Sequence, residues 1–164
     1  MQVSRALVGA KIEPARVIEI FQVKVEHRVL VSASPETIYS IYEDVANWRT
    51  WDPATKSSSL DGPFIAGSKG KLTPAKGNTV PMTLIEANAG RNFTVECKIP
   101  LFRMTFEHEL SCVGKECEVI HRAAFSGLLA PLLGRVIGAQ INRGLPDTLQ
   151  RLKNLAEAKE ESAV

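Results

Sequence analysis

The strongest constraint on the fold is a change of hydrophobic period at Gly127. Between residues 79 and 126, short runs of alternating apolar and polar residues are separated by turn residues, a pattern typical of antiparallel strands with one buried face. After Gly127, apolar residues recur at helical spacing as far as Leu155. A sheet with one apolar face must bury it, and this helix is the predicted element long enough to cover it. The sequence therefore predicts an α+β fold, in which a curved antiparallel sheet of about seven strands wraps around one long C-terminal helix.

The register of the last two strands follows from the turn between them. Gly114 and Lys115 separate two alternating runs and suit a two-residue turn with glycine at its first, positive-φ position. Counting outward from this turn places His108 opposite His121 on the face that otherwise carries apolar residues. These two residues form a non-hydrogen-bonded pair, the closer kind, so the sequence predicts two adjacent imidazoles on a buried face.

The segments before residue 79 complete the predicted order of elements. Residues 21–32 alternate, with Val23, Val25, His27, Val29 and Val31 on one side. A short amphipathic helix follows, with Ser34 as its N-cap and Pro35 at its first position. Two short strands joined by turns are expected between residues 49 and 78. We expect an N-terminal arm over residues 1–20, a single domain over residues 21–158 and a frayed tail over residues 159–164.

Composition places few other limits on function. The 164 residues are 45% hydrophobic and 23% charged, and their net charge of +2 gives no reason to expect a nucleic-acid partner. Charged residues interrupt the first twenty positions, so no secretory signal is predicted. The longest apolar stretch, "GLLAPLLGRVIGAQI", is broken by Pro131 and Arg135, and integral membrane association is not expected. A cytoplasmic protein is the expectation, and whether it forms a homodimer is left open.

The three cysteines do not have the spacing of a metal site. Cys97, Cys112 and Cys117 are an odd number, and thiols of an intracellular chain are normally reduced. Small buried apolar side chains are the simplest interpretation. Because Cys112 and Cys117 face each other beside the predicted turn, a cross-strand disulfide is also compatible with the register.

Several segments, taken in order, resemble the SRPBCC superfamily of helix-grip proteins. These proteins include START lipid-transfer domains, birch pollen allergen-like proteins and polyketide cyclases. The segments, which fall within residues 22–157, are "VSASPETIYSIYEDVANWRTWDP", "GPFIAGSKGKL", "FEHEL", "HRAAFSG" and "GLPDTLQRLKNLAE". The resemblance implies a cavity between the concave sheet and the long helix, in which family members bind hydrophobic small molecules. It supplies no shared catalytic residue, and the fold alone does not name a ligand.

The preferred functional hypothesis is non-covalent binding of a lipid-like or polyketide-like molecule in that cavity, without a cofactor. His108 and His121 would orient the ligand through its polar group, since apolar pockets commonly hold a few convergent polar groups. The predicted lining residues come from the strands and from the long helix. They are His27, Leu84, Phe93, Val95, Met104, Phe106, His108, His121, Phe125, Leu133, Ile137 and Ile141.

Other interpretations of the histidines stay open. Both can be neutral structural imidazoles satisfied by neighbours. Either can be the general acid or base of a cyclase or dehydratase, which requires a pKa near neutral pH. His27, on the neighbouring first strand, could complete a three-histidine metal site, although no inward carboxylate is predicted to support it. A protein-protein adaptor with a filled core is a further alternative.

Two more pairs of residues have alternative roles. Trp48 and Trp51 follow the short helix and can either pack it against the sheet or line a pocket entrance. Gly134 and Gly138 lie on one side of the long helix and can either allow close packing on the strands or leave room for a ligand.

Overall fold

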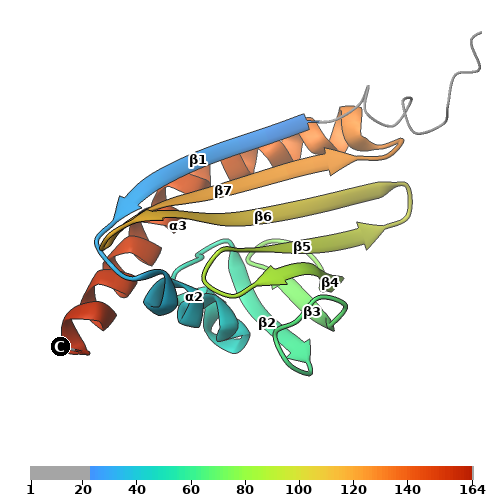
Figure 1. Cartoon of the computed structure of the whole chain (residues 1–164). Coiled ribbons are helices and arrows are strands. Elements are labelled where there is room, and N and C mark those ends of the chain that lie inside the picture. The colour runs from blue at the N-terminus through green and yellow to red at the C-terminus, as the bar shows by residue number, and fades with distance from the viewer. Residues whose placement is uncertain (1–22, 164) are drawn as a thin grey trace, which may run out of the picture.

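A computed structural model describes residues 23–163 of the chain. These residues form a seven-stranded antiparallel sheet with the order β1-β7-β6-β5-β4-β3-β2, covered by one long helix (Figure 1). The strands are β1 (Val23–Val31), β2 (Thr55–Asp61), β3 (Lys69–Pro74), β4 (Val80–Asn88), β5 (Asn92–Ile99), β6 (Phe102–Val113) and β7 (Glu116–Ser126). The helical segments are α2 (Pro35–Glu43), the 3-10 helix η1 (Val45–Thr50), the π-helical turn η2 (Ala130–Gly134) and α3 (Arg135–Ser162). The expected arm at residues 1–20 lies outside the described residues.

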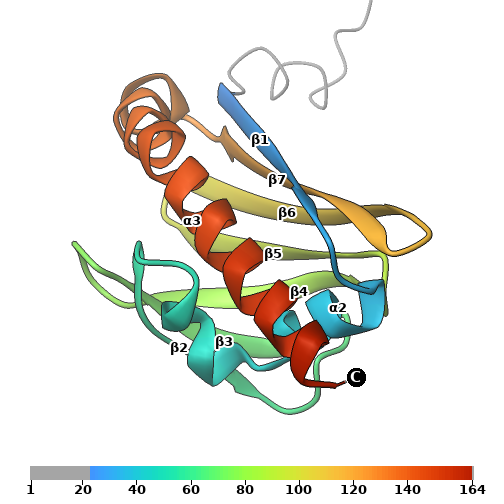
Figure 2. The same cartoon turned by 90° about the vertical axis from the view of Figure 1, so that its left-hand side faces the viewer.

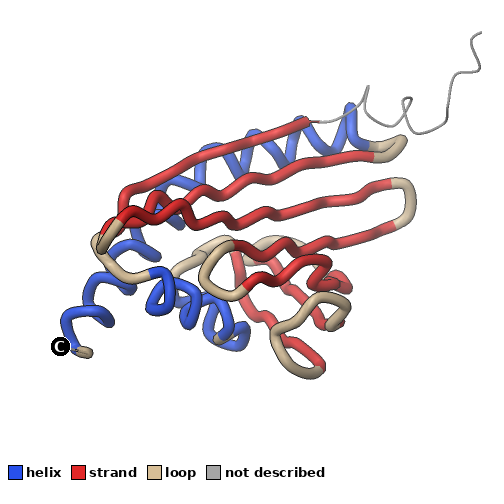
Figure 3. The backbone as a smooth tube through the Cα atoms, viewed as in Figure 1, coloured by secondary structure: helices blue, strands red, loops and turns tan. Residues whose placement is uncertain are grey.

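The helix-grip architecture predicted from the sequence is confirmed. Figures 2 and 3 show α3 running across one face of the strongly curved sheet, with α2 and η1 closing one end of the space between them. Among the helices of residues 23–163, none combines the length and the hydropathy that a membrane span needs.

The hairpin register is also confirmed. β6 and β7 pair with His108 opposite His121, and Gly114 has the positive φ angle of 64° expected for the first turn position. The first and last strands are neighbours, and their register places His27 beside His121. All three histidines therefore belong to one row of side chains across three adjacent strands.

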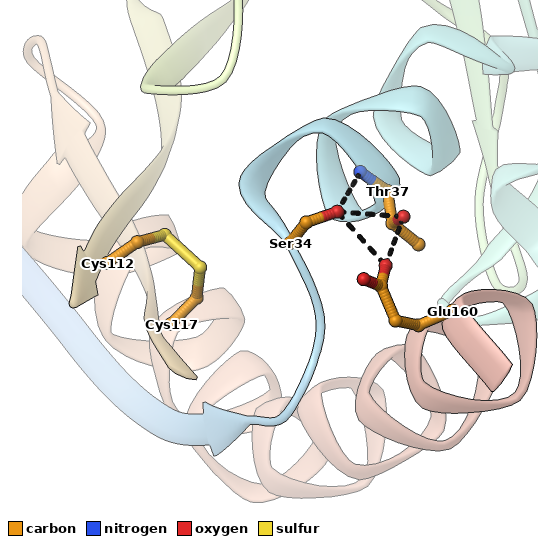
Figure 4. The surroundings of a disulfide bond; sticks show 5 residues. All are labelled: Ser34, Thr37, Cys112, Cys117 and Glu160. Atoms are coloured by element: carbon orange, nitrogen blue, oxygen red, sulfur yellow. Dashed lines mark hydrogen bonds between the residues drawn. A yellow bond between two sulfur atoms is a disulfide. The ribbon is translucent and has the colours of Figure 1, made fainter. Parts of the chain in front are cut away.

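Cys112 and Cys117 are joined by a disulfide (Figure 4), so the prediction of reduced, separate thiols is wrong for this pair. The two residues are direct cross-strand partners with a Cα–Cα distance of 4.0 Å. A non-hydrogen-bonded pair brings side chains this close, which is why the register made the bond feasible. Cys97 is buried and free.

The start of α2 is tied to the end of α3 by a polar cluster (Figure 4). The Ser34 hydroxyl accepts a bond of 3.2 Å from the Thr37 amide, which confirms the predicted N-cap. Ser34 also donates to the Glu160 carboxylate at 3.0 Å, and the Thr37 hydroxyl donates to the same carboxylate. These bonds tie Glu160 to the start of α2, and α3 extends to Ser162.

The sequence assigned too many residues to the inward side of α3. Leu132, Val136 and Leu155 belong to the apolar residues that recur at helical spacing after Gly127, but they are 67%, 64% and 37% exposed. Leu132 and Val136 directly precede inward residues, and adjacent positions on a helix are about 100° apart, so only one of each pair can face the sheet. Ile99, predicted to be inward at the end of β5, is 36% exposed.

Close packing explains the two glycines of α3. A Cβ atom at Gly134 would lie 3.1 Å from the Cβ of Phe125, and one at Gly138 would lie 3.3 Å from Val23. These glycines let the helix approach β1 and β7 closely. Pro146 lies within α3 without ending it, and the helix axis changes direction along its course (Figure 2).

The buried residues form two separate apolar clusters. The larger cluster joins α2, η1, the second half of α3 and the inner face of the sheet around Phe93 and Leu84. The smaller cluster lies around Phe102 and Phe125, where η2 and the first half of α3 pack on β1, β6 and β7. Met104 and Phe106 contact both clusters while being only partly buried. The two clusters therefore meet at Met104 and Phe106.

Candidate functional site

The two hairpin histidines lie side by side on the inner face of the sheet. Their ring centroids are 4.4 Å apart in an edge-to-face arrangement. Their surroundings come from distant parts of the chain, because α2 and η1 are folded under the strands. Three aromatic rings contact the pair, those of Tyr42, Trp51 and Phe93, and Trp48 packs against Trp51 and Phe93.

His121 is fully engaged by the protein. It is 3% exposed, and its Nε2 atom lies 2.9 Å from the hydroxyl of Tyr42, which is completely buried on α2. The sequence placed Tyr42 on the apolar side of its helix without assigning its hydroxyl a partner. A buried tyrosine hydroxyl nearly always has a hydrogen-bond partner. An inward polar residue on the facing strand, here His121, was the observation from which this bond could have been predicted.

His108 is in a different position. Its ring stacks on Phe93 with a centroid distance of 4.0 Å and an interplanar angle of 4°. Its Nδ1 atom is shielded from solvent and has no hydrogen-bond partner among the described residues, although the residue as a whole is only half-buried. Since buried polar atoms are normally satisfied, this nitrogen indicates an incomplete polar site.

Burial keeps both imidazoles neutral. Desolvation lowers the pKa of His108 to about 3, although nearby backbone carbonyls of Phe93 and Phe106 oppose the shift. Desolvation, together with repulsion from His108, also lowers the pKa of His121 well below its usual value. At neutral pH each ring therefore offers one donor and one acceptor and carries no charge.

The two tryptophans complete the enclosure. Trp48 and Trp51 are 5% and 3% exposed, and the Trp48 Nε1 atom donates to the Tyr42 carbonyl at 2.8 Å. They therefore pack the short helix against the sheet and do not line an open entrance. The Trp51 indole lies edge-on to His121 at 6.0 Å, and its Nε1 atom, like His108 Nδ1, has no partner among the described residues.

Several inward side chains between the sheet and the first half of α3 are only partly buried. Inward residues of central strands that a helix covers are normally fully buried, but here several are not. We call these half-buried residues the open inner wall: Met104, Phe106, His108, Leu133, Ile137 and Ile141.

The other predicted lining residues are part of the packed core. Leu84, Phe93, Val95 and Phe125 are at most 3% exposed. They support the open inner wall from behind and present almost no surface of their own. Half of the predicted set is thus brought together as accessible apolar surface, with His108 at its edge.

His27 faces the same space but is bound to α3. Its Nε2 atom lies 2.7 Å from the side-chain oxygen of Asn142. Within residues 23–163, no three His, Cys, Asp or Glu side chains are grouped as a metal site requires. The three-histidine alternative therefore finds no support in the described residues, and Asn142 is the polar partner that the sequence did not indicate.

The opposite face of the sheet is polar. It carries two depressions, of which the larger has a volume of about 370 Å³ and is lined by polar residues of β4 to β7. At their edge the Arg122 guanidinium donates to Glu26 and Glu109 at 2.6 Å, and Glu107 is 3.8 Å away. Arg122 is thus already neutralised by its neighbours, and this face is a solvated network of ion pairs, as the sequence predicted.

Comparison with known proteins decides the family. Residues 22–157 match the family described as polyketide cyclase / dehydrase and lipid transport. The chain belongs to this family. The match spans every strand and nearly all of α3, and the family lies within the superfamily that the sequence resembles. No curated protein matches the chain significantly.

Solved structures extend the likeness to the whole fold. The Zhui aromatase/cyclase from Streptomyces sp. R1128 has a TM-score of 0.71 at 17% identity, covering 87% of this chain and 98% of that one. Ara h 8.0201 has a TM-score of 0.65 at 10% identity, covering 84% and 99%. Norcoclaurine synthase from Thalictrum flavum, in complex with dopamine and hydroxybenzaldehyde, has a TM-score of 0.62 at 15% identity, covering 94% and 96%. At these identities the comparison supports the fold and says nothing of the ligand.

Proposed function

We propose that the chain binds a hydrophobic, lipid-like or polyketide-like small molecule between the sheet and the first half of α3. The observation that carries this proposal is the open inner wall, where apolar side chains of the sheet and the helix face each other and are only partly buried. Covering such a surface with a ligand is favourable by roughly 25 cal/mol for each Å² of apolar area removed from water. The family description, which names both cyclases and lipid transport, agrees with a ligand of this class.

His108 supplies the polar contact in this proposal. Its Nδ1 atom has no partner among the described residues, and its neutral state allows it to donate or accept. His121 holds the neighbouring position and is itself fixed by Tyr42. A hydroxyl or carbonyl of the ligand would therefore be oriented by His108, with His121 as its support.

Filling the open inner wall tests the binding site. Ile141→Trp places a large ring in the accessible space and should weaken binding of the fluorescent probe anilinonaphthalene sulfonate at least tenfold. Gln140→Trp is the matched control, because residue 140 is the exposed neighbour on the same helix turn. Equal affinities in the two variants would overturn the assignment of the site.

The polar contact is tested with a pair of probes that differ by one hydroxyl. His108→Leu should lower the affinity for naphthol by about 2- to 12-fold, the equivalent of a net hydrogen bond of roughly 0.5–1.5 kcal/mol. Affinity for naphthalene should be unchanged. A parallel loss for both probes would mean that His108 contributes only shape.

A cyclase- or dehydratase-type enzyme is the second candidate, and His108 would again be the residue that contacts substrate. General acid-base catalysis works best with a pKa near the operating pH, whereas burial lowers the pKa of His108 to about 3. This difference favours binding without proton transfer. The two hypotheses can be distinguished by using NMR to monitor exchange of the α-protons of a bound aryl ketone for deuterium. Exchange that occurs with the wild type and is abolished by His108→Leu would establish the enzyme.

A further inference from the structure

One end of the molecule exposes a cluster of large apolar side chains. The start of β1, the turn between β5 and β6, and the connection from β7 to α3 all lie at this end (Figure 1). We call the exposed side chains there the terminal apolar patch: Leu101, Leu128, Leu132 and Val136, which are 59%, 78%, 67% and 64% exposed.

The patch is continuous across two segments of the chain. The Leu129 amide donates to the Leu101 carbonyl at 3.1 Å, which holds the β5–β6 turn against the segment that enters α3. Leu128, Leu132 and Val136 recur at every fourth position, the spacing of one helical face.

The opposite face of the same segment is also apolar. Leu129, Leu133 and Ile137 point inward and join the smaller apolar cluster. An ordinary surface helix has a polar outer face, and a segment that is apolar on both sides is normally covered by something further.

The turn itself gives a second indication. Leu101 has a φ angle of 63°, and it is the non-glycine residue with positive φ among residues 23–163. Glycine or asparagine is the favoured residue in this conformation. The chain thus has an exposed leucine where a small or polar residue would suit both the backbone and the solvent.

The charge around the patch is positive. No Asp or Glu occurs between Glu118 and Asp147 in the sequence. Arg135 is exposed next to Val136 and forms no ion pair within the described part of the chain. At the β5–β6 turn, Lys98 and Arg103 share one carboxylate, that of Glu96, at 2.8 and 3.3 Å.

We propose that the terminal apolar patch docks on the surface of an anionic lipid bilayer. Leucine side chains that protrude from one end of the molecule can enter the boundary between headgroups and acyl chains, while Arg135 and the basic residues of the turn contact lipid phosphates. The Glu96 carboxylate at the turn is shared by two basic side chains, so an excess of positive charge remains at this end of the molecule. This mode of binding is interfacial and needs no transmembrane helix. It rests on exposure and charge and is independent of the internal ligand.

Vesicle co-sedimentation of the full chain tests the proposal. We expect binding to vesicles of phosphatidylcholine and phosphatidylglycerol in a two-to-one ratio, and weaker binding to phosphatidylcholine alone or at high salt. The double change Leu128→Glu with Leu132→Glu should lower the partition coefficient at least tenfold. Val113→Glu is the matched control, since Val113 is 84% exposed in the hairpin at the other end of the sheet and should leave binding unchanged.

Three results would overturn the proposal. The first is no sedimentation with anionic vesicles. The second is sedimentation that the double change leaves intact. The third is a double change that instead lowers the unfolding midpoint or splits an oligomer, which would mean that another part of the chain or a second copy covers the patch. Because the probe titrations above use no vesicles, each of these results leaves the test of the internal ligand site unaffected.

Discussion

At the scale of single residues, the two histidines share a face but differ in their partners. His121 is enclosed and bonded to Tyr42, whereas the Nδ1 atom of His108 is left without a partner in the described structure. An unpaired buried nitrogen costs stability, and proteins retain such features mostly where they are used. The asymmetry is the reason to assign a ligand contact to His108 and a supporting role to His121.

The Tyr42–His121 bond should be measurable by denaturation. Tyr42→Phe leaves the His121 nitrogen buried and unsatisfied, so the free energy of unfolding in urea should fall by about 1–3 kcal/mol. Tyr39→Phe is the control, because that hydroxyl makes a longer bond of 3.5 Å to the Asn92 carbonyl. A loss for Tyr42→Phe no greater than that of the control would contradict the role given to the pair.

At the scale of elements, the hairpin and the long helix show where a sequence pattern is informative. The turn at Gly114 and strict alternation fixed the pairing of β6 with β7, because a slip of one residue would turn every side chain to the wrong face. Helical spacing identified α3 but did not orient it, since Leu132 and Leu133 are equally apolar and only packing against β7 selects between them.

Side-chain partners across distant elements were less predictable. The Tyr42–His121 and His27–Asn142 bonds join residues far apart in the sequence, and no periodicity connects their positions. The lining of the inner face was predicted residue by residue, but which members stay partly buried depends on how η2 and α3 pack on the sheet, a property of the assembled fold.

The disulfide at the hairpin end should stabilise the chain modestly. Cys112 and Cys117 close a short loop that the turn already restricts, so the loop-entropy estimate of about 2 kcal/mol is an upper value. Reductant should therefore lower the free energy of unfolding by up to that amount.

The double variant Cys112→Ala with Cys117→Ala is the control and should not respond to reductant. Cys97 remains in both forms, and burial raises the pKa of its thiol to about 12, which disfavours thiolate exchange. If the unfolding midpoint of the wild type is identical with and without reductant, the disulfide either does not form or does not contribute to stability.

At the scale of the whole molecule, the fold consists of two apolar clusters that meet at Met104 and Phe106. The pair of neutral histidines packs against Tyr42 and Phe93 of the larger cluster. The stability of the whole domain therefore depends on pH through the protonation of these two rings.

Stability should decline as the pH falls below about 6.5, the pKa of histidine in the unfolded chain. The folded pKa values are lowered, so the unfolded state binds more protons, and the stabilisation present above pH 6.5 is lost progressively toward the folded value of about 3 for His108. Between pH 6 and 5 each histidine contributes a slope of at most about 1.4 kcal/mol per pH unit.

Urea unfolding across this range provides the measurement, and His108→Leu should roughly halve the slope because it removes one of the two groups. The lowered carboxylate pKa values of Glu26, Glu157 and Glu160 act at more acidic pH and do not interfere above pH 5. A slope unaffected by the substitution would show that His108 is not among the titrating groups.

The pairing of β1 with β7 has a consequence for how the protein is made. Of the described strands, β1 leaves the ribosome first and has β7, which is made last, as its sheet neighbour, so its hydrogen-bonding groups must wait until all the other described strands have been synthesised. Contacts this distant in sequence slow folding, and an unpaired apolar strand is open to the wrong partners in the meantime. Expression at low temperature or with chaperones that shield nascent strands should therefore raise the yield of native protein.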